Sequence, residues 1–259
     1  MRLQGGIFDI DGVLLDTPHE QAWREALAAL MAGPWRALVS QTTYAPDRFT
    51  SAVYQERVAG KPRAAGAAAA LAYFGVPDAD GARVREYAAA KQAALERLAA
   101  AGTVRVYADV LRFLLAVKAA GARVCTASSS KNADQFLRSV GVDGVAAAPH
   151  PPDLPPGATL LDLFDANVNG RDVPRGKPDP ALFLLAAGAL GLAPGRCFVV
   201  EDAPAGIAAA RAGGMVAIGI ARRDDAAALR DAGADLVVTS LDEIAVPALL
   251  RDGTLEGAR

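Results

Sequence analysis

The stretch IFDIDGVLLD, residues 7–16, places three aspartates and a glycine directly behind a short apolar run. With the two glycines before it, this run predicts a buried strand, GGIFDI, and Asp9 and Asp11 lie at its end. A carboxylate at the end of a buried strand is unfavourable unless it meets a cation or a reacting group. The stretch therefore predicts both the first strand of the fold and a functional site where that strand ends.

Four further short apolar runs, each bounded by glycine or a polar turn, predict strands that are covered on both faces. They are ARVCTAS (122–128), RCFVVED (196–202), MVAIGIA (215–221) and ADLVVTS (234–240). Helical patterns alternate with these runs and cover 109–121, 131–141, 179–191, 204–214 and 224–233. The alternation predicts an α/β core with a doubly wound, Rossmann-like parallel sheet, formed by residues 1–17 and 105–259.

The segment 18–104 has a different character, because its apolar residues recur with helical spacing throughout and no run in it suggests a strand. Its helical patterns cover 19–31, 50–60, 63–75 and 81–102. We expect an all-helical cap domain inserted after the first strand, with hinges near 15–18 and 102–106. A second irregular segment, 146–157, is rich in proline and predicts a surface loop.

The composition is that of a globular protein, with 52% hydrophobic and 22% charged residues among 259. A net charge of −2 offers no electrostatic attraction for nucleic acid or an anionic membrane, and no apolar stretch is long enough to span a bilayer. The acidic stretch begins at Asp9 and leaves no room for a signal peptide before it, so we expect a cytoplasmic protein. Cys125 and Cys197 stand singly in apolar runs and predict buried, reduced thiols.

Polar side chains gather where the predicted strands end, which is the edge at which open α/β sheets hold their active sites. Besides Asp9 and Asp11, that edge would carry Thr126, Ser128, Ser129, Ser130, Lys131, Asn132, Lys177, Glu201 and Asp202. Four carboxylates without cysteine or histidine ligands select a hard cation, and so sparse a set of oxygen ligands suits hydrated Mg²⁺. Magnesium with hydroxyls and lysines beside it predicts a site for a phosphoryl group.

Each of these features alone has an ordinary structural explanation. A Ser–Lys pair after a strand usually caps a helix, and a Glu–Asp pair usually forms a solvated turn. The combination of such features at successive strand ends, in chain order, favours a functional site instead.

Four motifs resemble those of the haloacid dehalogenase superfamily of phosphoryl transferases, in the beta-phosphoglucomutase-like branch that carries a helical cap. They are FDIDGVLLDT (8–17), TASSS (126–130), GKPDP (176–180) and VVEDAPAGIAAARAGG (199–214). The resemblance implies that Asp9 is the nucleophile and forms an aspartyl phosphate. It implies that Asp11 is the general acid and base, with its backbone carbonyl on the metal, and that Gly12 permits a sharp turn.

The same resemblance assigns roles to the other strand ends. Ser128 and Lys177 would hold the transferring phosphoryl oxygens, and Asp202, with Glu201, would complete the Mg²⁺ site. An acid at position 11 also argues for phosphate esters as substrates, because the dehalogenases and the phosphonate-cleaving branch lack it. The expected partner is a small phosphorylated metabolite, such as a sugar phosphate, and the expected assembly is a monomer or a weak homodimer.

The acceptor of the phosphoryl group stays open at this stage. Water would make the protein a phosphatase, which is the simplest hypothesis, and a second sugar hydroxyl would make it a mutase. Mutases of this branch bind a second phosphate, and the residues in the matching places here are Arg63, Lys91, Ser129, Ser130, Lys131 and Asn132. The ordinary alternatives are a surface arginine, a solvated lysine and a capped helix.

Two further observations bear on this choice. His19 stands where the mutases carry a histidine that couples cap closure to catalysis, but two residues are missing between Asp16 and His19. A third hypothesis, a regulator that binds a phosphorylated metabolite without turnover, normally goes with a lost nucleophile or acid, and Asp9 and Asp11 are both present.

Overall fold

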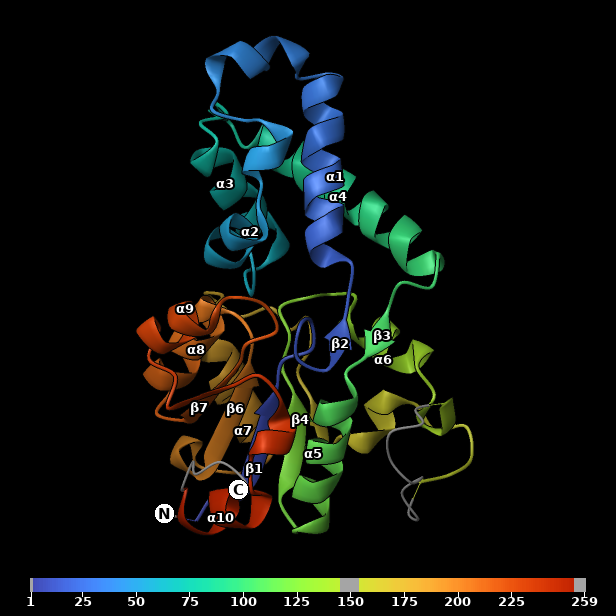
Figure 1. Ribbon diagram of the computed structural model, residues 1–259, viewed down its shortest axis with the longest axis vertical. Helices are drawn as coiled ribbons and strands as arrows, with labels where there is room; N and C mark the ends of the chain where they lie inside the picture. The colour runs from blue at the N-terminus through green and yellow to red at the C-terminus, as the bar shows by residue number, and fades with distance from the viewer. Residues whose placement is uncertain (1, 145–153, 254–259) are drawn as a thin grey trace. The chain divides into compact units, whose positions relative to one another are not determined.

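The computed structural model describes residues 2–144 and 154–253, so most of the predicted surface loop 146–157 falls outside the described residues. The chain divides into two compact units. One is formed by residues 1–16 and 105–259, and the other by residues 17–104. Figure 1 shows the first unit as a layered α/β structure and the second as a group of helices.

A six-stranded sheet in which every neighbouring pair is parallel forms the centre of the first unit, in the order β5-β4-β1-β6-β7-β8. Its strands are β1 Gly5–Phe8, β4 Arg123–Thr126, β5 Ala166–Asn167, β6 Cys197–Glu201, β7 Val216–Ile220 and β8 Leu236–Val238. In the register of the sheet, Ile7 pairs with Cys125 on one side and Val199 on the other. This confirms the predicted doubly wound parallel sheet and places β1 at the position where the strand order reverses.

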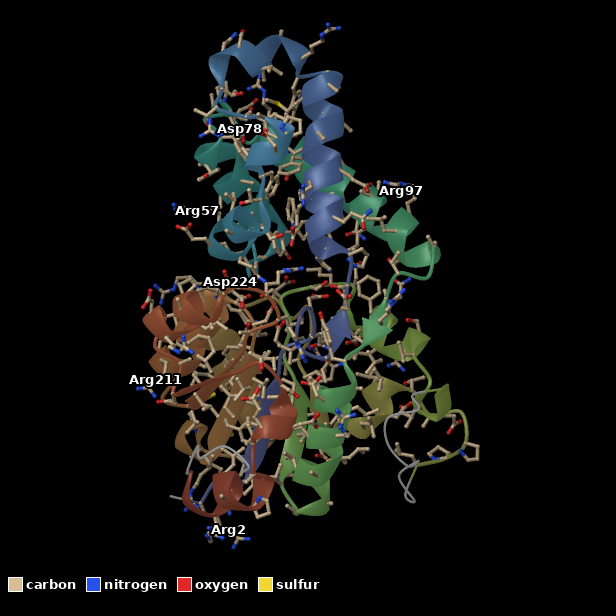
Figure 2. The ribbon with its side chains drawn as sticks, in the orientation of Figure 1. Arg2, Arg57, Asp78, Arg97, Arg211 and Asp224 are labelled. Atoms are coloured by element: carbon tan, nitrogen blue, oxygen red, sulfur yellow. The ribbon has the colours of Figure 1, made fainter. Side chains whose placement is uncertain are left out.

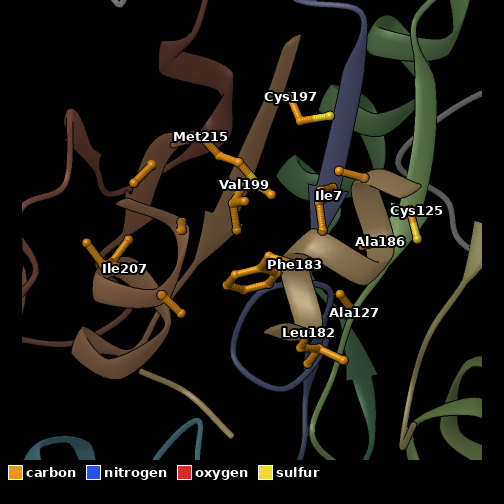
Figure 3. Packing of buried hydrophobic residues seen from close by; sticks show 14 of the residues in the cluster. Ile7, Cys125, Ala127, Leu182, Phe183, Ala186, Cys197, Val199, Ile207 and Met215 are labelled. Atoms are coloured by element: carbon orange, nitrogen blue, oxygen red, sulfur yellow. The ribbon is translucent and has the colours of Figure 1, made fainter. Parts of the chain in front are cut away.

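Helices cover both faces of this sheet. On one face α7 Ala181–Ala189, α8 Pro204–Ala212 and α9 Ala226–Asp231 pack against the strands. Figure 3 shows Phe183 of α7 and Ile207 of α8 in one buried cluster with Ile7 of β1 and Val199 of β6. Because successive strand residues alternate between faces, Phe8 and Phe198 point to the opposite side. There they form a three-ring cluster with Phe113 of α5 Ala108–Ala119, with ring centroids 5.9–6.2 Å apart.

The second unit consists of helices and turns. Its helices are α1 His19–Ala32, α2 Ser51–Arg57, α3 Arg63–Tyr73 and α4 Ala82–Ala100, and no strand occurs in residues 17–104, all of which are described. Helices α1 and α4 pack together through Trp23 and Tyr87, whose rings meet edge to face. The Tyr87 hydroxyl also donates to the Trp23 backbone carbonyl at 2.9 Å. Arg97 of α4, labelled in Figure 2, donates to Glu25 of α1 at 2.6 Å.

Three elements of the first unit are not predicted by the sequence patterns. Strand β5 has only two residues, too few to show a period, and helix α10 Val246–Asp252 lies beyond the last predicted strand. The third is an antiparallel pair of two-residue strands, β2 Leu15–Asp16 and β3 Arg105–Val106. This pair lies at the predicted hinges. It places the segment that leads into residues 17–104 beside the segment that leads out of them.

Two further observations concern the composition-based expectations. Cys125 and Cys197 are both buried free thiols, and burial raises the pKa of each. None of the described helices combines the length and the apolar character that crossing a membrane requires.

Candidate active site

The end of β1 turns sharply, and a glycine makes that turn possible. Gly12 has φ +87°, a backbone conformation that other residues adopt only with strain. A Cβ at this position would lie 2.0 Å from Oδ2 of Asp202, so the Gly12 backbone lies directly against that carboxylate. The N–H groups of residues 13–15 all donate to the carbonyl of Ile10, which closes the turn that carries Asp11. This tight loop holds Asp9 and Asp11 close to the end of β6.

Asp9 is 5% exposed and belongs to a buried group of charges. Lys177, from the loop before α7, donates to Oδ1 of Asp9 at 2.7 Å and also to Oε1 of Glu201. The second Glu201 oxygen accepts the backbone N–H groups of Asp202 and Ala203, each at 2.9 Å. Glu201 therefore holds the lysine and the first residues after β6 in place, and the lysine in turn holds Asp9.

Helix α8 approaches this group closely because its first turn contains a glycine. A Cβ at Gly206 would lie 1.8 Å from Oε1 of Glu201. Any larger residue there would push the helix away from the carboxylate.

Burial governs the electrostatics of the site. It raises the pKa of Asp9 to about 7, the charges of Glu201 and Asp11 raise it as well, and Lys177 lowers it. Burial alone would lower the pKa of Lys177, but Asp9 and Glu201 outweigh that effect and keep it above the ordinary lysine value. The lysine is therefore a fixed cation, and the negative charge around it exceeds what one cation neutralises.

The donor set fits a hard divalent cation. One carboxylate oxygen each from Asp9, Glu201 and Asp202 lie within 4.8 Å of one another, and all three residues are buried. Oxygen ligands alone suit Mg²⁺, and a surplus of buried negative charge favours it. Both Glu201 oxygens already accept hydrogen bonds, one from Lys177 and the other from two backbone N–H groups. A metal bound to Glu201 would therefore share an oxygen with one of these donors.

The loop after β4 carries the predicted hydroxyl group. Ser128 is 2% exposed, and its Oγ accepts the N–H of Ser130 at 3.1 Å. Ser130 Oγ in turn accepts the N–H of Asn132 at 3.3 Å. Asn132 directly precedes helix α6 Ala133–Ser139, but its side chain does not cap that helix. The loop is therefore shaped by two serine turns.

The other predicted residues of this loop are more exposed than Ser128. Lys131 forms a salt bridge with Asp172 at 2.9 Å, and the two side chains are 65% and 91% exposed. Ser129 is half-buried beside Ser128. Asn169 is a residue that sequence reasoning did not single out, although its side chain accepts the Ser128 N–H at 3.0 Å. The only sequence signal was a pair of asparagines in NVNG (167–170) next to a very short strand.

The predicted residues of the helical unit can be described within that unit. Lys91 is 2% exposed, lies 2.9 Å from Nδ1 of His19 and sits over the ring of Trp23. The alternative of a solvated lysine is thus wrong. Because an ammonium has no acceptor, Lys91 donates and His19 Nδ1 accepts. Arg63 begins α3, and burial lowers its pKa while Glu96 raises it.

The first unit, with its parallel sheet and its acidic, lysine-containing edge, is that of an α/β phosphoryl-transfer enzyme. A family model described as haloacid dehalogenase-like hydrolase matches residues 6–214, and the chain belongs to this family. This confirms the resemblance seen in the motifs.

Particular relatives extend the comparison over nearly the whole chain. A beta-phosphoglucomutase of Mycobacterium bovis is 35% identical over 257 residues, which cover 94% of this chain and 92% of the relative. A validoxylamine A 7'-phosphate phosphatase of Streptomyces hygroscopicus subsp. limoneus is 31% identical, covering 93% and 95%. The crystal structure of an archaeal beta-phosphoglucomutase from a Pyrococcus species is similar with a TM-score of 0.67 and 32% identity, covering 95% and 96%.

Proposed function

We propose that this protein is a Mg²⁺-dependent phosphoryl transferase that hydrolyses a small phosphorylated metabolite, most simply a sugar phosphate. The observation that carries the proposal is the buried carboxylate of Asp9, held by Lys177 at the end of β1 and faced by Asp202. A carboxylate fixed in this way can attack phosphorus in line and form an aspartyl phosphate. The relatives of this chain include a phosphatase and mutases of phosphorylated sugars, which supports a phosphorylated metabolite as the substrate.

Each residue of the site has a definite task in this mechanism. Lys177 fixes Oδ1 of Asp9, which leaves Oδ2 as the attacking oxygen, and its charge attracts the phosphoryl group. Ser128 donates its hydroxyl proton to a phosphoryl oxygen, because its own oxygen accepts from Ser130. Asp11, on the loop that Gly12 closes, protonates the leaving oxygen and then activates the incoming water. When bound by Asp9, Asp202 and the Asp11 carbonyl, Mg²⁺ would neutralise charge that develops on the phosphoryl oxygens.

A mutase is the second candidate, and one observation favours it. Lys91 is buried beside His19 and over the Trp23 ring rather than solvated, and a cation held in place in this way is suited to binding an anionic group. Arg63, at the start of α3, is a second cation of the same unit and makes no salt bridge within the described residues. Both residues would then bind a second phosphate on the substrate.

A phosphate-release assay over a panel of sugar phosphates tests the proposal. We expect release in the presence of Mg²⁺ and loss of activity in excess chelator. Formation of an isomerised product on addition of a trace of sugar bisphosphate, without net release, would establish the mutase instead. Substrate binding without either product would contradict both enzymes and identify a regulator, and full activity in chelator would remove Mg²⁺ from the mechanism.

A further inference from the structure

The side chain of Asn169, just after β5, is held by hydrogen bonds at both ends of its amide. Its Oδ1 accepts the backbone N–H of Ser128 at 3.0 Å. Its Nδ2 donates to Thr126 Oγ1 at 3.0 Å and to Asp134 Oδ1 at 2.8 Å. Because acceptors face the nitrogen and a donor faces the oxygen, only one orientation of the amide satisfies all three contacts.

A second asparagine and the first turn of α6 fix this amide in turn. Asn167 Oδ1 accepts the backbone N–H of Asn169 at 2.7 Å, and Asn167 Nδ2 donates to the same Asp134 oxygen at 2.8 Å. Asp134 belongs to α6, which begins directly after the Ser128–Asn132 loop. The loop is thus held from β5 on one side and from its own following helix on the other.

These contacts decide which group Ser128 can offer to a substrate. Its carbonyl accepts the N–H of Gly170 at 2.8 Å, its N–H is taken by Asn169, and its Oγ accepts from Ser130. Only the hydroxyl proton is then available to donate outward. Rotation of the Ser128 peptide would break two of these contacts, so the Asn169 amide sets the direction of that proton.

We propose that Asn169 is a positioning residue for phosphoryl transfer, acting through Ser128 and oriented by Asp134. The inference rests on the proposed function in so far as Ser128 donates to the phosphoryl group. Displacing a catalytic group by about 1 Å can lower the rate roughly 10²-fold, and losing one donor to a developing charge costs roughly 10²–10³-fold. Loss of the Asn169 amide should therefore lower kcat by a large part of the factor by which loss of the Ser128 hydroxyl lowers it.

A double-variant cycle on the Mg²⁺-loaded enzyme tests this inference. We expect Ser128→Ala to lower kcat about 100-fold and Asn169→Ala about 10–100-fold, at a temperature where both are fully folded. In the Ser128→Ala background, Asn169→Ala should cost less than about threefold, because its route to the substrate is already lost. Independent, multiplicative losses would overturn the inference, as would a kcat for Asn169→Ala within twofold of wild type.

A swap and a matched control separate positioning from general destabilisation. Asn169→Asp keeps the acceptor for Ser128 but turns a second acceptor toward Asp134, so kcat should fall. Adding Asp134→Asn turns a donor toward the new carboxylate at position 169 and should recover only part of kcat, because that donor also faces Asn167 Nδ2, from which the native Asp134 oxygen accepts. Asp165→Ala is the control, since Asp165 accepts the Val124 N–H at the opposite end of β4 at 2.7 Å. It should lower the melting temperature and leave kcat unchanged; a fall in kcat as large in Asp165→Ala as in Asn169→Ala contradicts the inference.

Amide hydrogen exchange gives a readout that needs no turnover. The Ser128 N–H should exchange at least tenfold faster in Asn169→Ala than in wild type, while the Val124 N–H is unaffected. If wild-type protein releases no phosphate, the proposed function fails, and exchange still tests the contact. If Ser128→Ala is fully active, the role of Ser128, and this inference with it, is wrong.

Discussion

The ammonium of Lys177, at the centre of the site, contacts the two buried carboxylates of Asp9 and Glu201. Lys177 and Glu201 have fully buried side chains, and that of Asp9 is 7% exposed. An arrangement of this kind is maintained by hydrogen bonding to every partner, since removing one member leaves an uncompensated buried charge. The residues of the site therefore depend on one another. A substitution that tests the role of one residue has to keep its shape, so that the others stay in place.

Asp9→Asn should abolish turnover while leaving the fold intact. The amide keeps the shape and can still accept from Lys177, but it cannot attack phosphorus. We expect kcat below about a thousandth of wild type, on the scale of losing covalent catalysis. Circular dichroism checks the fold, and retention of more activity than that would remove Asp9 from its role as nucleophile.

The same substitution should change how stability depends on pH in metal-free protein. The folded pKa of Asp9 is raised to about 7 from 3.8, so between roughly pH 4 and 7 the folded state binds more protons than the unfolded state. The contribution of Asp9 is therefore most favourable below pH 4 and is lost as the pH rises through 7. Asp9→Asn lacks this loss, and since one pKa unit corresponds to about 1.4 kcal/mol, the variant should gain more than 1 kcal/mol on wild type.

Urea unfolding in chelator at pH 5 and pH 8 measures this difference. Groups that titrate alike in both proteins cancel in the comparison. A wild-type to variant difference that is the same at both pH values would show that burial does not raise the pKa of Asp9.

At the scale of elements, one arginine connects four segments of the first unit. Arg222, after β7, donates to both oxygens of Asp109 on α5, at 3.0 and 3.1 Å, and its guanidinium stacks 3.9 Å above the ring of Tyr107. Asp109 also accepts the N–H of Leu241 at 2.9 Å. The Tyr107 N–H donates to the Leu14 carbonyl, so this group supports the turn that carries Asp11.

Arg222→Met should destabilise the protein by about 3 kcal/mol, because it leaves the Asp109 carboxylate buried without its cation. In a protein of this size that corresponds to a fall in melting temperature of roughly 6–12 °C. Combining it with Asp109→Asn should recover much of the loss. Thermal unfolding measures both, and a loss below 1 kcal/mol in the single variant would mean that solvent replaces the arginine.

The sequence predicted most of the longer elements, because they contain enough residues to show a period. The strand at Gly5–Phe8 and the helix at Ala82–Ala100 could be located, whereas β5 at Ala166–Asn167 could not. The carboxylates at strand ends were predictable because parallel strands bring their ends to one edge. Asn169 and Arg222 were not, since their partners come from segments 41 and 113 residues away that only the folded chain brings together.

At the scale of the whole molecule, substrate choice is the property least fixed by the core, and the helical unit carries the residues proposed to provide it. Arg63→Ala should lower kcat/KM about 10–100-fold on a sugar phosphate that bears a second phosphate, since a charge-assisted contact is worth roughly 1.5–3 kcal/mol. Turnover of acetyl phosphate, which has no second phosphate, should barely change. Equal losses on both substrates would make Arg63 a structural residue, and no loss on either would remove it from binding.

The pairing of β2 with β3 has a consequence for how such a protein can diversify. Leu15 lies opposite Val106 and Asp16 opposite Arg105, so the chain leaves the sheet-containing unit and returns to it at neighbouring points. Eighty-eight residues, 17–104, thus occupy the place of a hairpin loop. A different insert, long or short, could be spliced between the same two strands without disturbing the register of any core strand. The residues proposed for catalysis and those proposed for substrate recognition are thus encoded in separate stretches of sequence, which meet at this pair of strands.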